Sequence, residues 1–216
     1  MRKELGRAFL PCFNLFFTPR RKGAFFMTEN KEKETKKNSI SLTKRLVGTA
    51  MFAALSYAVS FLEFPIFPAA SFLKLDFSAV FIVLSAFLFG PVFGVSACAV
   101  KELLCFLTKS STGGVGEIAN FIVITGFILI PSVVYCFKKG LPVVIVTLSI
   151  GCLVQVGLSL LTNRFINFPL FMGDYAKTAF ESLWVYVALF NLIKSVAISA
   201  VTVLVYKRIS KIIKSI

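Results

Sequence analysis

The uncharged stretch "FSAVFIVLSAFLFGPVFGVSACAV", residues 77–100, decides how many helices this chain forms. It holds 24 residues without a charge, more than the roughly 20 that cross a bilayer core of about 30 Å. Gly90, Pro91 and Gly94 interrupt it, and proline and glycine favour a turn over a continuous helix. We therefore predict a tight turn at "GPVFG" between two helices, 77–90 and 94–109.

The rest of the chain is equally apolar. Of 216 residues, 57% are hydrophobic and 25 are Phe, which exceeds the composition of soluble domains. Strands of a membrane barrel alternate in polarity and these runs do not. The sequence predicts an all-α integral membrane protein with six transmembrane helices. The other four predicted spans are 46–64, 117–137, 142–163 and 182–206. We expect a proline-rich loop at "PIFPAASFLK" and a longer loop holding Arg164, Asp174, Lys177 and Glu181.

Basic residues predict the orientation. Of 24 Lys and Arg, twelve lie in residues 1–45 and four in the last ten. Six spans place 18 basic residues inside against four outside, whereas five spans would put the basic C-terminus outside. We expect a multi-pass protein of the cell membrane with both termini cytoplasmic. The tails suit anionic lipid, and without interleaved aromatics they do not suggest nucleic-acid binding.

Three regions follow from these patterns. Residues 1–43 are predicted to be a disordered basic cytoplasmic tail. Within this tail, we interpret residues 1–26 as an incorrectly assigned extension and Met27 as the true start. Residues 44–208 form the six-helix membrane domain, and 209–216 a basic cytoplasmic C-terminus. Five scattered cysteines and no histidine indicate neither a metal site nor a Cys/His catalytic centre.

Polar groups inside the spans mark the candidate site, because each costs free energy in hydrocarbon unless it is paired or lines a cavity. They concentrate in the outer half of the bundle, with Lys74 and Asp76 at its mouth. The predicted ligand-binding residues are Leu73, Lys74, Asp76, Lys101, Glu102, Asn120, Asn163, Asn191 and Lys194. The alternative is structural: a buried Lys–Glu pair and amides that hold the helices together.

Two features of the sequence bear on partner proteins: a face of small residues on the first helix and the absence of a nucleotide-binding motif. Ala50, Ala54 and Ala58 share one face of the first helix, which suits close helix contact, although alanine is also common in membrane helices. The glycines of "TGGVGEIANF" precede no Gly-Lys-Ser/Thr, so they are not a Walker loop. Uphill movement of a substrate would then draw its energy from a partner or an ion gradient, and we do not expect an enzyme.

Five motifs stand in order along residues 42–214: "FLKLDFS", "FLFGPVFGV", "GGVGEIANF", "LTNRFINFPLF" and "FNLIKSVAIS". Together they resemble the riboflavin-specific substrate-binding (S) components of energy-coupling factor (ECF) transporters. The resemblance implies six helices and a flavin pocket open to the outside. It also implies a membrane coupling subunit, on which the alanine face docks, and two ATPases. Riboflavin would be the transported ligand rather than a cofactor.

The resemblance further implies ligand contacts by Asn163, Asn191 and Lys194, with Asn120 near the pocket. The chain departs from the family pattern at Ala79 and Phe81, where an acid and a proline are frequent, and at Glu102, where asparagine is common. Three alternatives stay open: an S component for another flavin or vitamin, an autonomous secondary transporter of a small metabolite coupled through Glu102, and an intramembrane enzyme.

Overall fold

The computed structural model describes residues 42–67, 73–110, 112–138 and 140–215, with side chains up to residue 208. The chain divides after Lys44 into two compact units, and residues 45–216 belong to the second. The predicted N-terminal tail lies outside the described residues except for its last two positions. For the predicted C-terminal segment 209–216, the structure describes only the backbone of residues 209–215.

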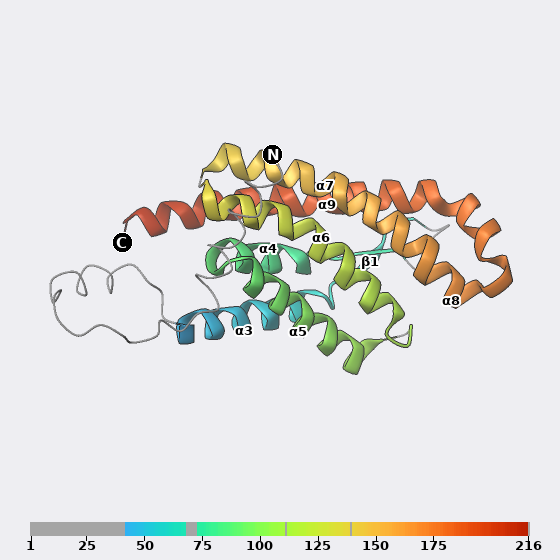
Figure 1. Ribbon diagram of the computed structural model, residues 1–216. Helices are drawn as coiled ribbons and strands as arrows, with labels where there is room; N and C mark the ends of the chain where they lie inside the picture. The colour runs from blue at the N-terminus through green and yellow to red at the C-terminus, as the bar shows by residue number, and fades with distance from the viewer. Residues whose placement is uncertain (1–41, 68–72, 111, 139, 216) are drawn as a thin grey trace, which may run out of the picture. The chain divides into compact units, whose positions relative to one another are not determined.

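Helices make up nearly all of this region (Figure 1). They are α3 (Leu42–Val59), α4 (Ser78–Phe89), α5 (Pro91–Lys109), α6 (Val115–Phe137), α7 (Leu141–Thr162), η2 (Asn163–Asn167), α8 (Phe168–Met172), η3 (Gly173–Tyr175) and α9 (Ala176–Ser215). Each of the six predicted spans overlaps one long helix. The predicted first span ends too late, because α3 stops at Val59 and a turn follows at Ser60 and Phe61.

The break between α4 and α5 falls within the predicted turn, but the second helix starts earlier than expected. Pro91 is the first residue of α5, a position where its missing N–H costs nothing and its fixed φ suits a helix. Gly94 therefore lies inside α5 rather than in the turn. A Cβ on Gly94 would stand 2.4 Å from the Cβ of Ala86, so the glycine lets α4 and α5 pack closely.

Helix α4 lies at the centre of the core. Nine of its 12 residues are buried, as expected for a helix that is apolar all round. Its Ile82 and Val83 pack with Ile128 of α6, Leu148 of α7 and Ile198 of α9. Polar groups that border α4 are thereby held among several helices at once.

Among the described residues, three helical stretches are long and apolar enough to cross a membrane: Pro91–Lys109, Val115–Phe137 and the run Leu141–Arg208, which contains both α7 and α9. Helix α4 is apolar but has only 12 residues, about 18 Å at 1.5 Å per residue. The structure is thus that of a helical protein with membrane-capable helices. Six crossings stay a prediction.

The predicted loop at residues 164–181 is wrong, because this segment is helical. Arg164 lies in η2, Asp174 in η3, and Lys177 and Glu181 in α9. The chain reverses at Gly173, whose φ of 51° is a backbone conformation that glycine adopts easily. Helix α9 then returns beside α7 (Figure 1).

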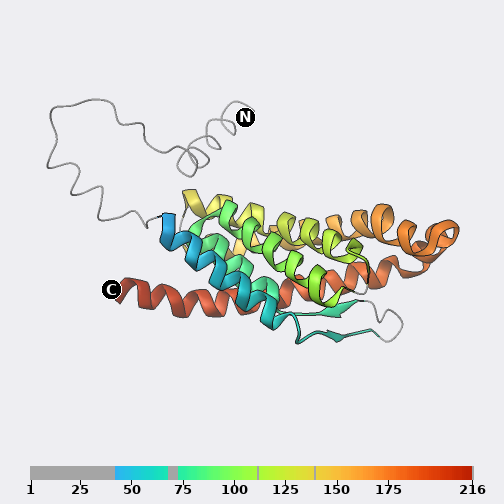
Figure 2. The same ribbon diagram turned by 90° about the horizontal axis from the view of Figure 1, so that it is seen from below.

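The predicted proline-rich loop contains a short antiparallel ribbon instead. Strand β1 (Phe64–Pro65) pairs with β2 (Lys74–Leu75), with Phe64 opposite Leu75. Figure 2 shows this ribbon beyond the end of α3. Residues 68–72, between the two strands, lie outside the described part. The ribbon fixes the approach of the chain to Asp76 and α4.

Candidate functional site

Asp76 and Lys194 form a buried ion pair between distant parts of the chain. The Lys194 Nζ lies 2.8 Å from Asp76 Oδ1, and both side chains are 8% exposed. Asp76 follows β2 directly, and Lys194 lies within α9. The Ser78 hydroxyl donates to the other carboxylate oxygen, while the Ser56 hydroxyl of α3 donates to the Ser78 carbonyl. The pair therefore joins the ribbon, α4 and α9.

Lys101 and Glu102, which are both buried, form a second polar group with the half-buried Asn120. Lys101 Nζ donates to Glu102 Oε1 at 2.8 Å, and Asn120 Nδ2 of α6 donates to the same oxygen at 2.5 Å. Lys101 and Glu102 thus form the buried Lys–Glu pair that the sequence left open as a structural alternative. Glu102 Oε1 thus accepts hydrogen bonds from both Lys101 and Asn120, and this trio of residues links α5 to α6.

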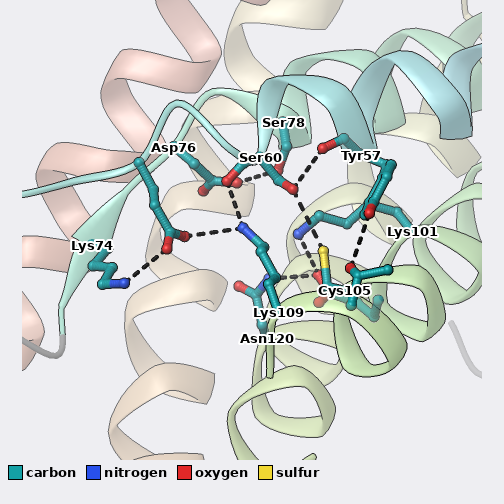
Figure 3. Close-up of polar contacts among 12 residues, drawn as sticks. Tyr57, Ser60, Lys74, Asp76, Ser78, Lys101, Cys105, Lys109 and Asn120 are labelled. Carbon is teal, nitrogen blue, oxygen red and sulfur yellow. Dashed lines mark hydrogen bonds and ion pairs between the residues drawn. The ribbon is translucent and has the colours of Figure 1, made fainter. Parts of the chain in front are cut away.

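The pair and the trio act on each other electrostatically. Burial alone would raise the pKa of Asp76, but the charges of Lys194 and of Lys101 hold this pKa well below its usual range. In Figure 3 the side chains of Asp76, Lys101 and Asn120 reach into one region between the ribbon and α5. We call these five residues, Asp76, Lys101, Glu102, Asn120 and Lys194, the buried charge cluster.

The two remaining predicted asparagines border the α7–α9 side. Asn163 Nδ2 donates to the Ser159 carbonyl at 2.8 Å, and Asn191 Nδ2 to the Val187 carbonyl at 2.9 Å. Asn163 begins the π-helical turn η2 and accepts a hydrogen bond from Asn167. Such turns often occur at functional sites. Asn191 precedes Lys194 by three residues, which places it on the same face of α9.

Gln155 was not among the predicted site residues. It is 1% exposed, and its Oε1 has no hydrogen-bond partner among the described residues. A buried acceptor without a partner is costly, which makes Gln155 a further candidate site residue. It shares a face of α7 with Ser159 and Thr162, at i+4 and i+7. The signal was present, because Gln155 is the one glutamine of the chain and interrupts an apolar run.

Apolar side chains pack on the ribbon side of the cluster. Leu73, predicted as a ligand contact, is buried with Leu75, Phe168 of α8, and Val187 and Phe190 of α9. A flat aromatic ring requires walls of this kind, with a few polar groups to orient it. Leu73 thus lies in an apolar layer rather than among the charges.

Lys74 is placed apart from the other predicted site residues. Its Nζ lies 2.8 Å from Glu63 Oε1, and Lys109 Nζ lies 3.2 Å from Glu63 Oε2. Lys109 also donates to the Ser60 carbonyl at 2.5 Å. We call Glu63, Lys74 and Lys109 the surface clamp; Figure 3 labels its two lysines. It joins the end of α3, the ribbon and the end of α5.

Comparison with known proteins gives the family. Residues 44–206 match the family model "ECF transporter, substrate-specific component". The chain belongs to the substrate-specific components of ECF transporters. It is 32% identical to the riboflavin transporter RibU of Staphylococcus aureus, over 84% of this chain and 98% of that protein. It is 29% identical to the riboflavin transporter FmnP of Bacillus subtilis, over 76% and 90%.

The fold of a solved S component agrees with this assignment. The structure described as that of the S component of a bacterial ECF transporter superposes with a TM-score of 0.71 at 34% identity. The superposition covers 81% of this chain and 99% of the solved chain. The relatives named here are thus riboflavin transporters and an S component of an ECF transporter.

The arrangement in this S component suits recognition by hydrogen bonds. It combines amides, an unpartnered acceptor, paired charges and an apolar layer, and its described residues contain no group of His, Cys, Asp and Glu that could hold a metal ion. The three predicted interface alanines, Ala50, Ala54 and Ala58, are all exposed, while Thr49, Ala53 and Ser56 of the same helix are buried. Helix α3 therefore presents Ala50, Ala54 and Ala58 on its exposed face.

Proposed function

We propose that this chain captures riboflavin at the outer face of the cell membrane and passes it inward. It would act with a membrane coupling subunit and two ATPases. The protein then spans the membrane six times with both termini cytoplasmic. Its ligand site comprises the buried charge cluster, Asn163, Asn191 and the apolar layer at Leu73, and we add Gln155.

One observation carries this proposal: α9 holds a buried amide, Asn191, and a paired lysine, Lys194, together with apolar-layer residues such as Val187, in a chain related to riboflavin transporters. The isoalloxazine ring offers carbonyl and imide groups to amides and a lysine, and its faces require apolar walls. The ribityl hydroxyls can both donate and accept. An unpartnered oxygen such as Gln155 Oε1 suits a donor of this kind.

Calorimetric titration of the purified chain in detergent with riboflavin tests the ligand, with thiamine and biotin as controls. We prefer calorimetry to quenching of Trp184, because that side chain is 48% exposed. Saturable binding of riboflavin alone, without ATP or partners, supports the proposal. Selective binding of thiamine or biotin would redirect it to another vitamin, and no binding at all would contradict it.

Asn191→Ala tests the site. Its amide nitrogen donates to the Val187 carbonyl of its own helix, so its loss leaves no buried charge unpaired. We expect riboflavin affinity to fall about tenfold, or about 1.4 kcal/mol. The matched control is Leu192→Ala, because Leu192 is the next residue and is exposed. Equal affinity in both variants would remove Asn191 from the site.

The exposed alanine face of α3 is the proposed docking surface for the coupling subunit. Ala54→Leu adds bulk where close helix approach requires small residues. We expect it to abolish uptake and assembly while riboflavin binding persists. Ala200→Leu, at an exposed alanine of α9, is the control. Full uptake by Ala54→Leu would place the interface elsewhere, and uptake by this chain alone would favour the autonomous transporter.

A further inference from the structure

The buried charges of this structure balance. Among the described residues, the buried charged side chains are Asp76, Lys101, Glu102 and Lys194. Two are cations and two are carboxylates, and each cation lies 2.8 Å from one carboxylate. The cluster therefore has no net charge.

Glu102 is the member whose removal changes the balance with the smallest structural cost. Asp76 connects the ribbon to α4 and α9 through Lys194 and Ser78. Glu102 pairs instead with its sequence neighbour on α5 and with Asn120. A glutamine would keep an oxygen for both donors while removing the charge.

We infer that Glu102 sets the charge specificity of the site: by neutralising Lys101 it makes the site select an uncharged ligand and discriminate against the phosphorylated form of the same ligand. The inference rests on the proposed function. Its chemical class is a neutral polyhydroxylated flavin, as opposed to its phosphate ester.

The physical reason is Coulombic. A phosphate monoester carries about −1.5 to −2 charges at pH 7. A neutral cluster offers it no attraction to offset the loss of its hydration. Without the Glu102 carboxylate, Lys101 would be an uncompensated buried cation. At about 10 Å and an effective dielectric constant between about 20 and 80, its attraction for a dianion corresponds to about fivefold to a few hundredfold in affinity.

The test measures one ratio, the Kd of riboflavin 5′-phosphate divided by the Kd of riboflavin, by calorimetry on the full chain. The ratio cancels effects on the shared ring and ribityl chain. We expect Glu102→Gln to lower the ratio at least about fivefold, and Lys101→Met to raise it, because the cluster then carries a net negative charge.

Two controls separate net charge from local damage. Lys101→Met/Glu102→Gln restores neutrality, and its ratio should return to within about twofold of the wild type. Glu181→Gln removes the same charge from an exposed position, and it should leave the ratio unchanged. If Glu102→Gln fails to fold, the wild type and Lys101→Met still compare a neutral cluster with a negatively charged one.

Each outcome of this test either supports or overturns the inference. A ratio that follows the net charge of the cluster through these variants supports the inference. A ratio unchanged in whichever single variant folds overturns it, even though the wild type binds riboflavin. A wild type that binds no riboflavin overturns the proposed function, and the charge inference with it.

Discussion

Two groups of charges near the ribbon differ in how they are solvated. In the buried charge cluster, Lys194 and Asp76 are each 8% exposed, whereas in the surface clamp Lys74 is 48% and Glu63 30% exposed. Both groups contain ion pairs at 2.8 Å. Breaking the buried pair should therefore cost more free energy than breaking the exposed pair of the same length. A buried charge that loses its partner cannot recover hydration from water.

The comparison also separates two roles within one predicted set. Lys74 and Asp76 are two residues apart, yet one belongs to the clamp and the other to the cluster. Strand β2 ends at Leu75, so the strand alternation that would place residues i and i+2 on one face does not extend to Asp76. The clamp fastens the ribbon, and the cluster connects it to the core.

The largest effect is expected from breaking the buried pair. Lys194→Met leaves Asp76 buried without its cation, a change that costs about 3–5 kcal/mol. Its thermal unfolding midpoint in detergent should fall far more than that of Lys74→Met, the matched clamp variant. Asp76→Asn/Lys194→Met should recover much of the loss. Equal midpoints for the two single variants would show that burial does not separate the two groups.

Gln155 sharpens the comparison, because it is a buried polar group without a partner. Gln155→Leu removes the unpaired acceptor and should stabilise the ligand-free chain by about 1–2 kcal/mol, while the added stability from bound riboflavin should shrink. Thermal unfolding with and without riboflavin measures both. The control is Ser159→Ala, since that hydroxyl already donates to the Val156 carbonyl. A destabilised ligand-free chain would indicate a structural role for Gln155.

A smaller effect is expected from breaking the clamp. Glu63→Gln removes the carboxylate shared by Lys74 and Lys109 and should lower stability by less than about 1 kcal/mol. The loss should shrink further in 1 M salt, which screens partly exposed charges. Unfolding midpoints at low and high salt measure it. A loss as large as that of Lys194→Met, and indifferent to salt, would contradict the solvated description of the clamp.

The smallest effect is the pH dependence of the clamp. Partial burial would raise the pKa of Glu63, but hydrogen bonds from Lys74 and Lys109 hold it below its ordinary value of 4.5. The contribution is therefore complete above pH 4.5 and is lost as pH falls through the lower folded pKa. The midpoint difference between wild type and Glu63→Gln should vanish once the pH lies below this lowered pKa. A difference that grows on acidification would reverse the sign of the shift.

The sequence predicted the helices because their signals are local. An uncharged run of sufficient length, broken by Gly90 and Pro91, predicts two helices without reference to the rest of the chain. The helical segment after Asn163 was missed, because its charges and Pro169 resemble those of a loop. Packing of Phe168 against Phe180 of α9 and against Val187 stabilises a helix that composition alone does not favour.

The sequence by itself thus determined the helical class, the family motifs and the set of costly polar residues, because hydrophobicity and its interruptions are written along the chain. Only the tertiary structure decided the partners: Lys194 with Asp76, Asn120 with Glu102, and Lys74 with Glu63 outside the cluster. Pairing depends on how separate elements approach and on which face of each is buried. The spacing of residues along one chain does not contain that information.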